Sequence, residues 1–334
     1  MKRQTEEYIK NSTITLQNDL YRLKVLTYGA TLQELSIQED GWQNIVLSYD
    51  SVEEYVQDSY YLGATIGRVA GRIENSTFDL GGETYTLPAN EGDHHLHGGD
   101  GLHCRIWTVD QVTPDCLTLR YISPDGENGY AGTLHVRATF ELTDQDVSIT
   151  YEATTDQDTV CDMTNHTYFN LSGGERDILN HELTLSADRY AELKDDLIPT
   201  GQLSAVDGTP FDFRSGRVLA DGPSSHHPQN QLVNGYDHPF VFKDKNEAIL
   251  YDPDTRRQLT LSTTAPAIVL YSGNQINNHT PLREGTSRTY YGLCLEPQHL
   301  PNAVHQDAFP SIVLRAGETY KWQTTYRVET GVSR

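Results

Sequence analysis

Short segments in which apolar and polar residues alternate recur along almost the whole chain, and they constrain the fold more than any other feature of the sequence. Such alternation over four to eight residues predicts half-buried β-strands, and the turn residues between the segments favour antiparallel neighbours over parallel crossovers. Examples are residues 13–16, 21–25, 117–122, 134–140, 147–151, 183–185, 259–261, 268–271, 312–314 and 320–326. We therefore predict an all-β protein built as a large antiparallel β-sandwich.

The composition does not change along the chain in a way that would mark a domain boundary. A chain of 334 residues could hold two average domains, but large all-β folds often form one. Residues 221–230 are rich in turn formers, and we interpret them as a loop because a strand pattern resumes at 240–242. Helix signals are few, and the clearest is the capping-box pattern from Ser51 to Glu54. The prediction is a single domain over residues 1–334 with few short helices.

The formal net charge is −22, and a field of this sign disfavours binding to nucleic acid and to anionic membranes. No apolar run approaches the roughly 20 residues that span a bilayer, and residues 1–7 lack the apolar core of a signal peptide. The cysteines have no CxxC spacing and are expected to be free thiols in a reducing compartment. They are Cys104, Cys116, Cys161 and Cys294. These features predict a soluble cytoplasmic protein without nucleic-acid or membrane partners.

A carboxylate stands near the end of a strand predicted within residues 291–302. With a period of two, Gly292, Cys294 and Glu296 share one face, and the two small residues leave space beside the acid. Pro297 cannot donate to a sheet ladder, so we expect the strand to end there. A carboxylate held on a rigid element beside an open space suits a general base, although a solvated Glu on an ordinary strand has the same pattern.

Residues 159–171 are predicted to form another strand, with a polar face that carries an acid, a histidine, two hydroxyls and an amide. On that face lie Asp162, Thr164, His166, Tyr168 and Asn170. Such a face suits a carbohydrate ligand. The alternative is a plain antiparallel strand with its polar side in water.

Three histidines follow a hairpin that is predicted over residues 78–87. They are His94, His95 and His97, in a loop rich in glycine and acids. They could ligate a metal ion, but their spacing is neither that of a zinc helix nor that of a Cys knuckle. A histidine that donates to a ligand oxygen is the other interpretation.

Five short segments, taken in order, resemble the signature segments of the aldose 1-epimerase family, also called galactose mutarotases. They are Gly67–Ile73, Leu96–Gly99, Asn165–Leu171, Gly235–His238 and Cys294–Glu296. Each is weak alone, but their order is specific, and the resemblance spans nearly the whole chain. It implies the galactose mutarotase-like supersandwich fold.

The resemblance also implies roles for five residues. Glu296 matches the family's general base and His166 its general acid. The positions that match residues holding the sugar oxygens are Arg72, His97 and Asp237. We expect the concave face of one sheet to carry all five residues. Asp237 is expected in a turn-rich loop over residues 234–239, from which it could reach a ligand.

One position departs from the family pattern. Many relatives have a glutamine directly before the segment that here runs over residues 270–274, and this chain has Val269 instead. The departure removes a contact to a sugar hydroxyl and leaves the preferred hexose open, but it does not affect the acid/base pair.

Interconversion of sugar anomers requires one base to take the C1 hydroxyl proton and one acid to protonate the ring oxygen. Each group contributes roughly a hundredfold to ten-thousandfold, and Glu and His have reference pKa values of about 4.3 and 6.5. No redox cofactor or metal is required. We therefore predict an isomerase, an aldose 1-epimerase that acts on a free monosaccharide such as galactose or glucose, without a cofactor, as a monomer or homodimer.

Three alternatives remain. A non-catalytic sugar-binding module would keep the sugar-holding residues but has no need of Glu296. An epimerase of hexose 6-phosphates would need several converging basic residues, and Arg68 and Arg72 are the basic pair near the motifs. A metal-dependent isomerase would use the three histidines of residues 94–97.

Overall fold

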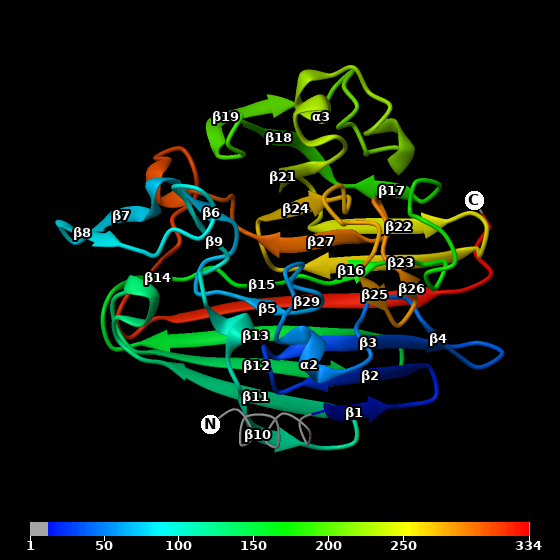
Figure 1. Cartoon of the computed structure of the whole chain (residues 1–334), viewed down its shortest axis with the longest axis horizontal. Helices are drawn as coiled ribbons and strands as arrows, with labels where there is room; N and C mark the ends of the chain where they lie inside the picture. The colour runs from blue at the N-terminus through cyan, green and yellow to red at the C-terminus, as the bar shows by residue number, and fades with distance from the viewer. Residues whose placement is uncertain (1–12, 334) are drawn as a thin grey trace.

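The computed structural model describes residues 13–333, so the segment of residues 1–7 lies outside the described residues. A nine-stranded antiparallel sheet runs through the molecule, and Figure 1 shows its strands following one another from β10 upward. In spatial order the strands are β10 (Thr108–Val112), β11 (Cys116–Ser123), β12 (Leu134–Leu142), β13 (Val147–Thr155), β29 (Thr319–Glu329), β23 (Arg257–Thr263), β22 (Glu247–Asp252), β17 (Glu182–Leu185) and β20 (Arg217–Val218).

Two smaller sheets pack against the nine-stranded sheet. The first, with four strands, contains β1 (Thr13–Gln17), β2 (Tyr21–Leu26), β3 (Thr31–Gln38) and β4 (Trp42–Asn44). The second, with six strands in spatial order, contains β16 (Tyr168–Phe169), β27 (Leu293–Gln298), β24 (Ala267–Tyr271), β21 (Asp237–Phe242), β18 (Ala187–Leu193) and β19 (Pro199–Ala205). The predicted antiparallel β-sandwich is confirmed.

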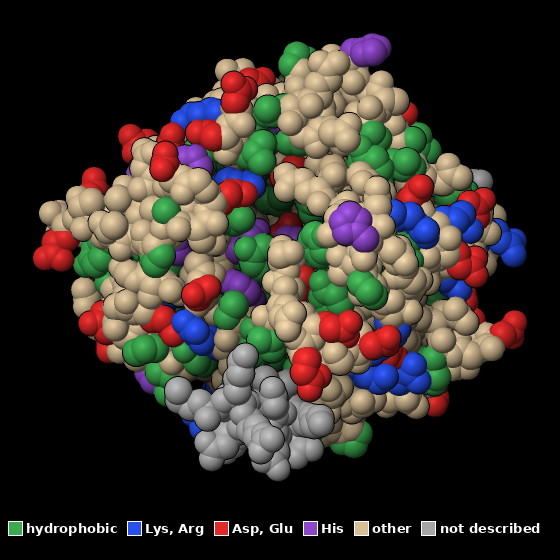
Figure 2. Space-filling view, viewed as in Figure 1, with side chains coloured by type: hydrophobic (Ala, Val, Ile, Leu, Met, Phe, Trp, Pro, Cys, Tyr) green, Lys and Arg blue, Asp and Glu red, His purple; other side chains and the backbone are tan. Residues whose placement is uncertain are grey.

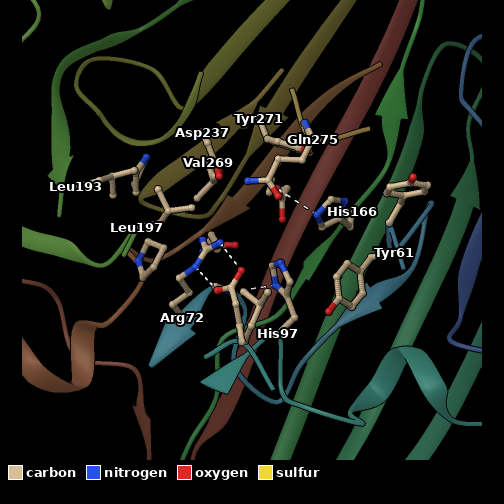
Figure 3. Close-up of a pocket in the computed structure, with 18 of the residues that line it drawn as sticks. Tyr61, Arg72, His97, His166, Leu193, Leu197, Asp237, Val269, Tyr271 and Gln275 are labelled. Atoms are coloured by element: carbon tan, nitrogen blue, oxygen red, sulfur yellow. Dashed lines mark hydrogen bonds and ion pairs between the residues drawn. The ribbon is translucent and has the colours of Figure 1, made fainter. Parts of the chain in front are cut away.

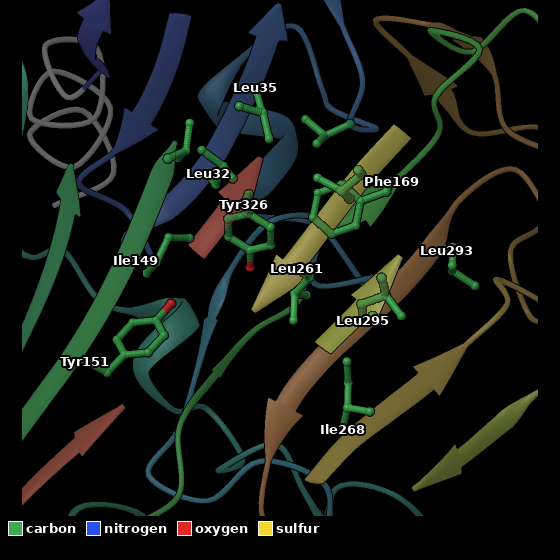
Figure 4. Packing of buried hydrophobic residues seen from close by; sticks show 14 of the residues in the cluster. Leu32, Leu35, Ile149, Tyr151, Phe169, Leu261, Ile268, Leu293, Leu295 and Tyr326 are labelled. Carbon is green, nitrogen blue, oxygen red and sulfur yellow. The ribbon is translucent and has the colours of Figure 1, made fainter. Parts of the chain in front are cut away.

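One hydrophobic core joins the three sheets. It takes Leu35 from β3, Ile149 from β13, Leu261 from β23, and Ile268 and Leu295 from β24 and β27, all of them buried. Figure 4 shows these side chains meeting between the layers. They belong to the apolar faces of alternating strands, and burial of each such side chain contributes roughly 1.5–3 kcal/mol.

Short elements complete the described chain. The paired two-stranded elements are β5 (Thr65–Ile66) with β15 (Thr164–Asn165), β6 (Arg72–Ile73) with β9 (His95–Leu96), β7 (Thr77–Leu80) with β8 (Glu83–Thr86), β14 (Thr159–Val160) with β28 (Val313–Leu314), and β25 (Pro281–Leu282) with β26 (Gly285–Thr286). The helices of residues 13–333 are α2 (Val52–Tyr55), α3 (Pro228–Val233) and the 3₁₀ turns η1 (Glu74–Ser76), η2 (Leu102–Cys104), η3 (Glu127–Gly129), η4 (Leu219–Asp221) and η5 (Ala303–His305).

Several local predictions are confirmed. The hairpin forms as β7 and β8, and α2 begins with a capping box made by Ser51 and Glu54. All four cysteines are free. The interpretation of residues 221–230 as a loop is wrong in part, because η4 ends at Asp221 and α3 begins at Pro228. Within residues 13–333, no helix is both long and apolar enough to cross a membrane.

The prediction of one strand over residues 159–171 is wrong. The segment bends twice and forms β14, β15 and β16, which pair with three different partners. The side chains of residues 159–171 are all buried, so the alternative of a polar side in water is wrong as well. The carboxylate of Asp162 is hydrogen-bonded to the ring Nδ1 of His299. The side-chain amide of Asn170 donates to the carbonyls of Arg176 and Tyr291. Asp162 and Asn170 therefore fulfil separate structural roles.

The predicted end of a strand at Pro297 is also wrong, because β27 continues to Gln298. Pro297 lies opposite Ile268 of β24, while β16, on the other side of β27, pairs with Leu293 and Cys294 only. The proline nitrogen thus faces a side of the strand where no ladder hydrogen bond is needed. Glu296 lies within the strand and not at its end.

Candidate active site

A cavity of about 270 Å³ opens beside the six-stranded sheet. Figure 2 shows the hollow near the centre of the viewed face, with histidine and charged side chains around it. Its volume lies just below the roughly 300–1,000 Å³ of typical small-molecule sites, which suits a ligand as small as one sugar. All five residues singled out from the sequence line it, namely Arg72, His97, His166, Asp237 and Glu296.

Neighbouring strands of the six-stranded sheet form one wall of the cavity. Glu296 on β27 is paired in register with Val269 on β24, and Tyr271 of β24 is paired with Asp237, the first residue of β21. Their side chains project from the same face of the sheet into the cavity (Figure 3). Strand pairing therefore fixes the position of both carboxylates, which is more rigid than a loop would be.

His166 lies between β15 and β16, and its backbone is fixed on both sides. Its N–H donates to the carbonyl of Ala64, and its carbonyl accepts from the N–H of Gly63. The Nε2 atom of His166 lies 3.8 Å from Oε1 of Glu296, and Nδ1 lies 3.5 Å from the sulfur of Cys294. The imidazole is thus held between the thiol of Cys294 on one side and the catalytic candidate Glu296 on the other.

Burial changes the protonation of this pair. It raises the pKa of Glu296 well above the usual range of a carboxyl group, with a further increase from Asp237 and a smaller opposing effect of Arg72. It lowers the pKa of His166 to about 4. Both side chains are almost inaccessible to water, and each neutral form is favoured as a result. Perturbed pKa values in a cleft are typical of functional sites.

The opposite wall comes from the two-stranded element β6–β9. His97 follows β9 directly. Its ring Nδ1 accepts the backbone N–H of Gly71, and the backbone N–H of His97 donates to the carbonyl of Gly71. Since Nδ1 accepts, a neutral His97 carries its hydrogen on Nε2. Burial lowers the pKa of His97 well below its usual range, and the nearby His166 and Arg72 add to the effect. Its ring is therefore a neutral donor.

Gly98 allows the backbone after β9 to pack directly against the backbone at Gly67. A Cβ atom on Gly98 would lie 2.0 Å from the carbonyl oxygen of Gly67, and its φ of +79° is one that other residues rarely adopt. The His-Gly-Gly sequence after β9 is thus a requirement of the backbone as well as of the site.

Tyr61 closes the side of the cavity between the histidines. Its ring contacts those of His97 and His166, with centroid distances of 4.9 and 5.7 Å. The preceding loop is fixed by the carboxylate of Asp58, which accepts the backbone N–H groups of Tyr60 and Leu62. Asp58 and Tyr61 were not singled out by the sequence analysis, because neither belongs to a recognisable motif.

The expectation that a single concave sheet face would carry all five residues is wrong for Arg72 and His97. These two lie on or next to β6–β9, outside the six-stranded sheet. Asp237, expected in a turn-rich loop, is the first residue of β21. The sequence analysis also missed Glu91 and Gln275, which line the cavity.

The other candidate ligands turn away from the cavity. His94 pairs with Asp196, and His95 contacts the hydroxyl of Tyr130 and the carbonyl of Pro88. The three histidines of residues 94–97 therefore do not converge, and the metal-site interpretation of that loop is wrong. Arg68 is buried, and its guanidinium donates to backbone carbonyls and to a serine hydroxyl.

Comparison with known proteins identifies the family. The family model described as aldose 1-epimerase matches residues 12–327. The chain belongs to the aldose 1-epimerase family. Among curated members, the galactose mutarotase of Sus scrofa is 37% identical over 322 residues, which cover 93% of this chain and 92% of the relative. The aldose 1-epimerase of Escherichia coli is 37% identical over 328 residues, 94% of each chain.

Solved structures of family members have the same fold. An aldose epimerase homologue from C. elegans superposes with a TM-score of 0.89 at 30% identity, covering 95% of this chain and 98% of that one. Galactose 1-epimerase from Lactobacillus acidophilus gives a TM-score of 0.86 at 34% identity, covering 96% and 95%. The galactose mutarotase-like architecture implied by the sequence motifs is thereby confirmed.

Proposed function

We propose that this protein is an aldose 1-epimerase that interconverts the α and β anomers of free hexoses such as galactose and glucose. The observation that carries the proposal is the pair of His166 and Glu296, whose Nε2 and Oε1 atoms lie 3.8 Å apart at the wall of a sugar-sized cavity. Family membership and the names of the curated relatives support the same activity.

In the proposed reaction, Glu296 takes the proton of the C1 hydroxyl while His166 donates a proton to the ring oxygen. The C1–O5 bond then breaks, and the aldehyde rotates about C1–C2. For closure on the other face, Glu296 returns its proton to the aldehyde oxygen as the C5 oxygen attacks C1 and gives its proton to His166. Protons and electrons balance over the cycle, with both groups restored.

The remaining cavity residues hold the sugar. His97 donates from Nε2, Arg72 donates from its guanidinium, and Asp237 accepts from sugar hydroxyls. Asp237 also places a negative charge near Glu296, and Arg72 opposes it. Before the reaction the pair holds one proton, and this proton is on Glu296, because burial favours neutral Glu296 and neutral His166. Sugar binding has to move this proton to His166 before the ring opens.

A hexose 6-phosphate epimerase is the alternative enzyme, and the charges of the cavity disfavour it. Among the described residues that line the cavity, Arg72 is the sole Lys or Arg. A phosphate usually requires several such groups. Comparison of kcat/KM for galactose, glucose and their 6-phosphates by polarimetry tests the proposal. We expect the free hexoses to react faster, and a faster reaction of a 6-phosphate would favour the alternative.

A non-catalytic sugar-binding module is the other alternative. Such a protein would bind hexoses in calorimetry without accelerating mutarotation, whereas the proposed enzyme does both. The retention of Glu296 and His166 in one cavity supports the enzyme.

A further inference from the structure

Glu91 occupies a position in the cavity that the proposed reaction does not use. Its carboxylate binds the guanidinium of Arg72 through two contacts, with Nε–Oε2 at 2.5 Å and Nη2–Oε1 at 2.9 Å. Such a two-point pair uses one edge of the guanidinium, the edge that would otherwise bind a carboxylate or phosphate of a ligand. The Arg72 fork is therefore already engaged by the protein's own acid.

The backbone around Glu91 fixes this arrangement. Glu91 and His94 exchange two backbone hydrogen bonds, which close a tight turn. The side chain of the preceding Asn90 accepts from the N–H of Leu96 and donates to its carbonyl, which ties the turn to β9. The side chain of Glu91 remains 38% exposed, so it also faces the opening of the cavity.

The cavity has an excess of acidic groups. Among its described lining residues, Glu91 and Asp237 oppose the single guanidinium of Arg72, which leaves a formal charge of −1 when these two carboxylates are ionised and Glu296 is in its neutral form. In a cleft with low-dielectric walls, a field of one sign strongly affects which ligands enter.

A nearby cation does not offset this charge. The β18–β19 hairpin contributes Leu193 and Leu197 to the cavity, and between them Lys194 is paired with Glu74 at 2.6 Å. The charge of this lysine is therefore already partly compensated on the outside of the wall.

We propose that Glu91 is a charge-selecting residue: it keeps anionic sugars such as hexuronates out of the site and admits protonated amino sugars as a further substrate class beside neutral hexoses. This inference rests on the proposed anomer interconversion. A like charge facing the ligand is an effective means of rejecting one class of substrate, and an opposite charge attracts another.

The test compares three sugars that differ in charge and share the galactose ring. Mutarotation of D-galactose, D-galacturonate and D-galactosamine is followed by polarimetry at low ionic strength, at a pH where the amine is protonated. The wild-type protein, Glu91→Gln and Glu141→Gln are compared. Glu141 is an exposed residue of β12 that does not line the cavity, so its variant matches the change in net charge.

We expect wild-type kcat/KM to be at least about tenfold lower for galacturonate than for galactose, with galactosamine accepted. Glu91→Gln should raise the galacturonate-to-galactose ratio roughly tenfold and lower the galactosamine-to-galactose ratio, while Glu141→Gln changes neither. Added salt should reduce the discrimination of the wild-type protein.

Unchanged ratios in Glu91→Gln, or equal changes in both variants, would overturn the charge-selecting role. A wild-type protein that turns over galactose and galacturonate equally would also overturn it. Failure to accelerate galactose mutarotation at all would instead refute the proposed function, so the two failures are distinguishable.

Discussion

His166 and Glu296 face each other across 3.8 Å, a distance longer than a hydrogen bond, between Nε2 of the imidazole and Oε1 of the carboxylate. Neither group is committed to the other, and His166 is instead oriented through Nδ1 by the thiol of Cys294. Both therefore remain available to a ligand in the cavity.

The pH dependence of kcat/KM should show that the pKa of Glu296 lies above that of His166, the reverse of their reference order. With the reference pKa values of Glu and His, kcat/KM would fall at low pH as Glu296 gains a proton and at high pH as His166 loses one. Burial reverses this order, because it raises the pKa of Glu296 and lowers that of His166 to about 4. On acidification the pair is singly protonated until His166 also binds a proton, so kcat/KM should fall only near pH 4. On the alkaline side it should fall as Glu296 loses the last proton.

Nitrogen NMR of the free protein checks this order directly. The ring of His166 should remain neutral at pH 6, with assignment by comparison to His166→Asn. An imidazolium signal of His166 at that pH would contradict the reversed order.

Removal of metal ions should leave the activity unchanged, because one acid and one base suffice. Within residues 13–333, the donor atoms of His166, Cys294 and Glu296 lie within 4.8 Å of one another, so they could bind zinc. Mutarotation is measured after dialysis against EDTA and after addition of Zn²⁺. We expect no loss from EDTA and inhibition by Zn²⁺, which would occupy the catalytic pair. A rate lost on dialysis and restored by metal would contradict the prediction.

Asp237→Asn should weaken sugar binding more than it slows turnover. The carboxylate accepts from sugar hydroxyls both before and during ring opening, so its loss affects ground state and transition state alike. We expect KM to rise by roughly tenfold, with kcat changed less than about threefold. Steady-state polarimetry separates the two constants. A fall in kcat that equals the fall in kcat/KM would indicate that Asp237 acts in the transition state alone.

Val269→Gln should change sugar preference without changing the chemistry. Val269 lines the cavity in register with Glu296, so an amide there can reach a sugar hydroxyl. One added hydrogen bond of about 0.5–1.5 kcal/mol corresponds to a KM lowered roughly twofold to tenfold for the hexose that makes it. Val269→Leu, measured on galactose and glucose, controls for the increase in side-chain size. An equal effect of both variants would attribute the change to volume.

The sandwich could be predicted from the sequence because alternation depends on local sterics and burial. The pattern of residues 134–140 corresponds to β12, whose inward residues are buried and whose outward residues are exposed. The segment of residues 159–171 shows the limit of this reasoning. Its alternation has the same period, but contacts with β5, β27 and β28 bend it into three pieces. Such tertiary contacts leave no trace in a short window of sequence.

The site, like the fold, could be predicted from the sequence only in part. Arg72 and Glu296 are separated by more than 200 positions, and the motifs of the family named both. Glu91 could not be recognised, since a Glu in a polar loop is usually solvated and only its pairing with Arg72 gives it a role. Pro297 misled the prediction of a strand end, because the tolerance of a proline depends on whether the neighbouring strand needs its N–H.

Polarimetry of fresh α-D-galactose with wild-type protein and with Glu296→Gln tests the central claim most directly. The amide keeps the shape of the carboxylate but cannot take the C1 hydroxyl proton, and this transfer belongs to the transition state alone. With Glu141→Gln as the matched control and sugar binding followed by calorimetry, the wild-type protein should accelerate mutarotation. Glu296→Gln should bind galactose yet lose at least about a hundredfold in kcat. A Glu296→Gln protein with near-normal kcat would contradict the mechanism.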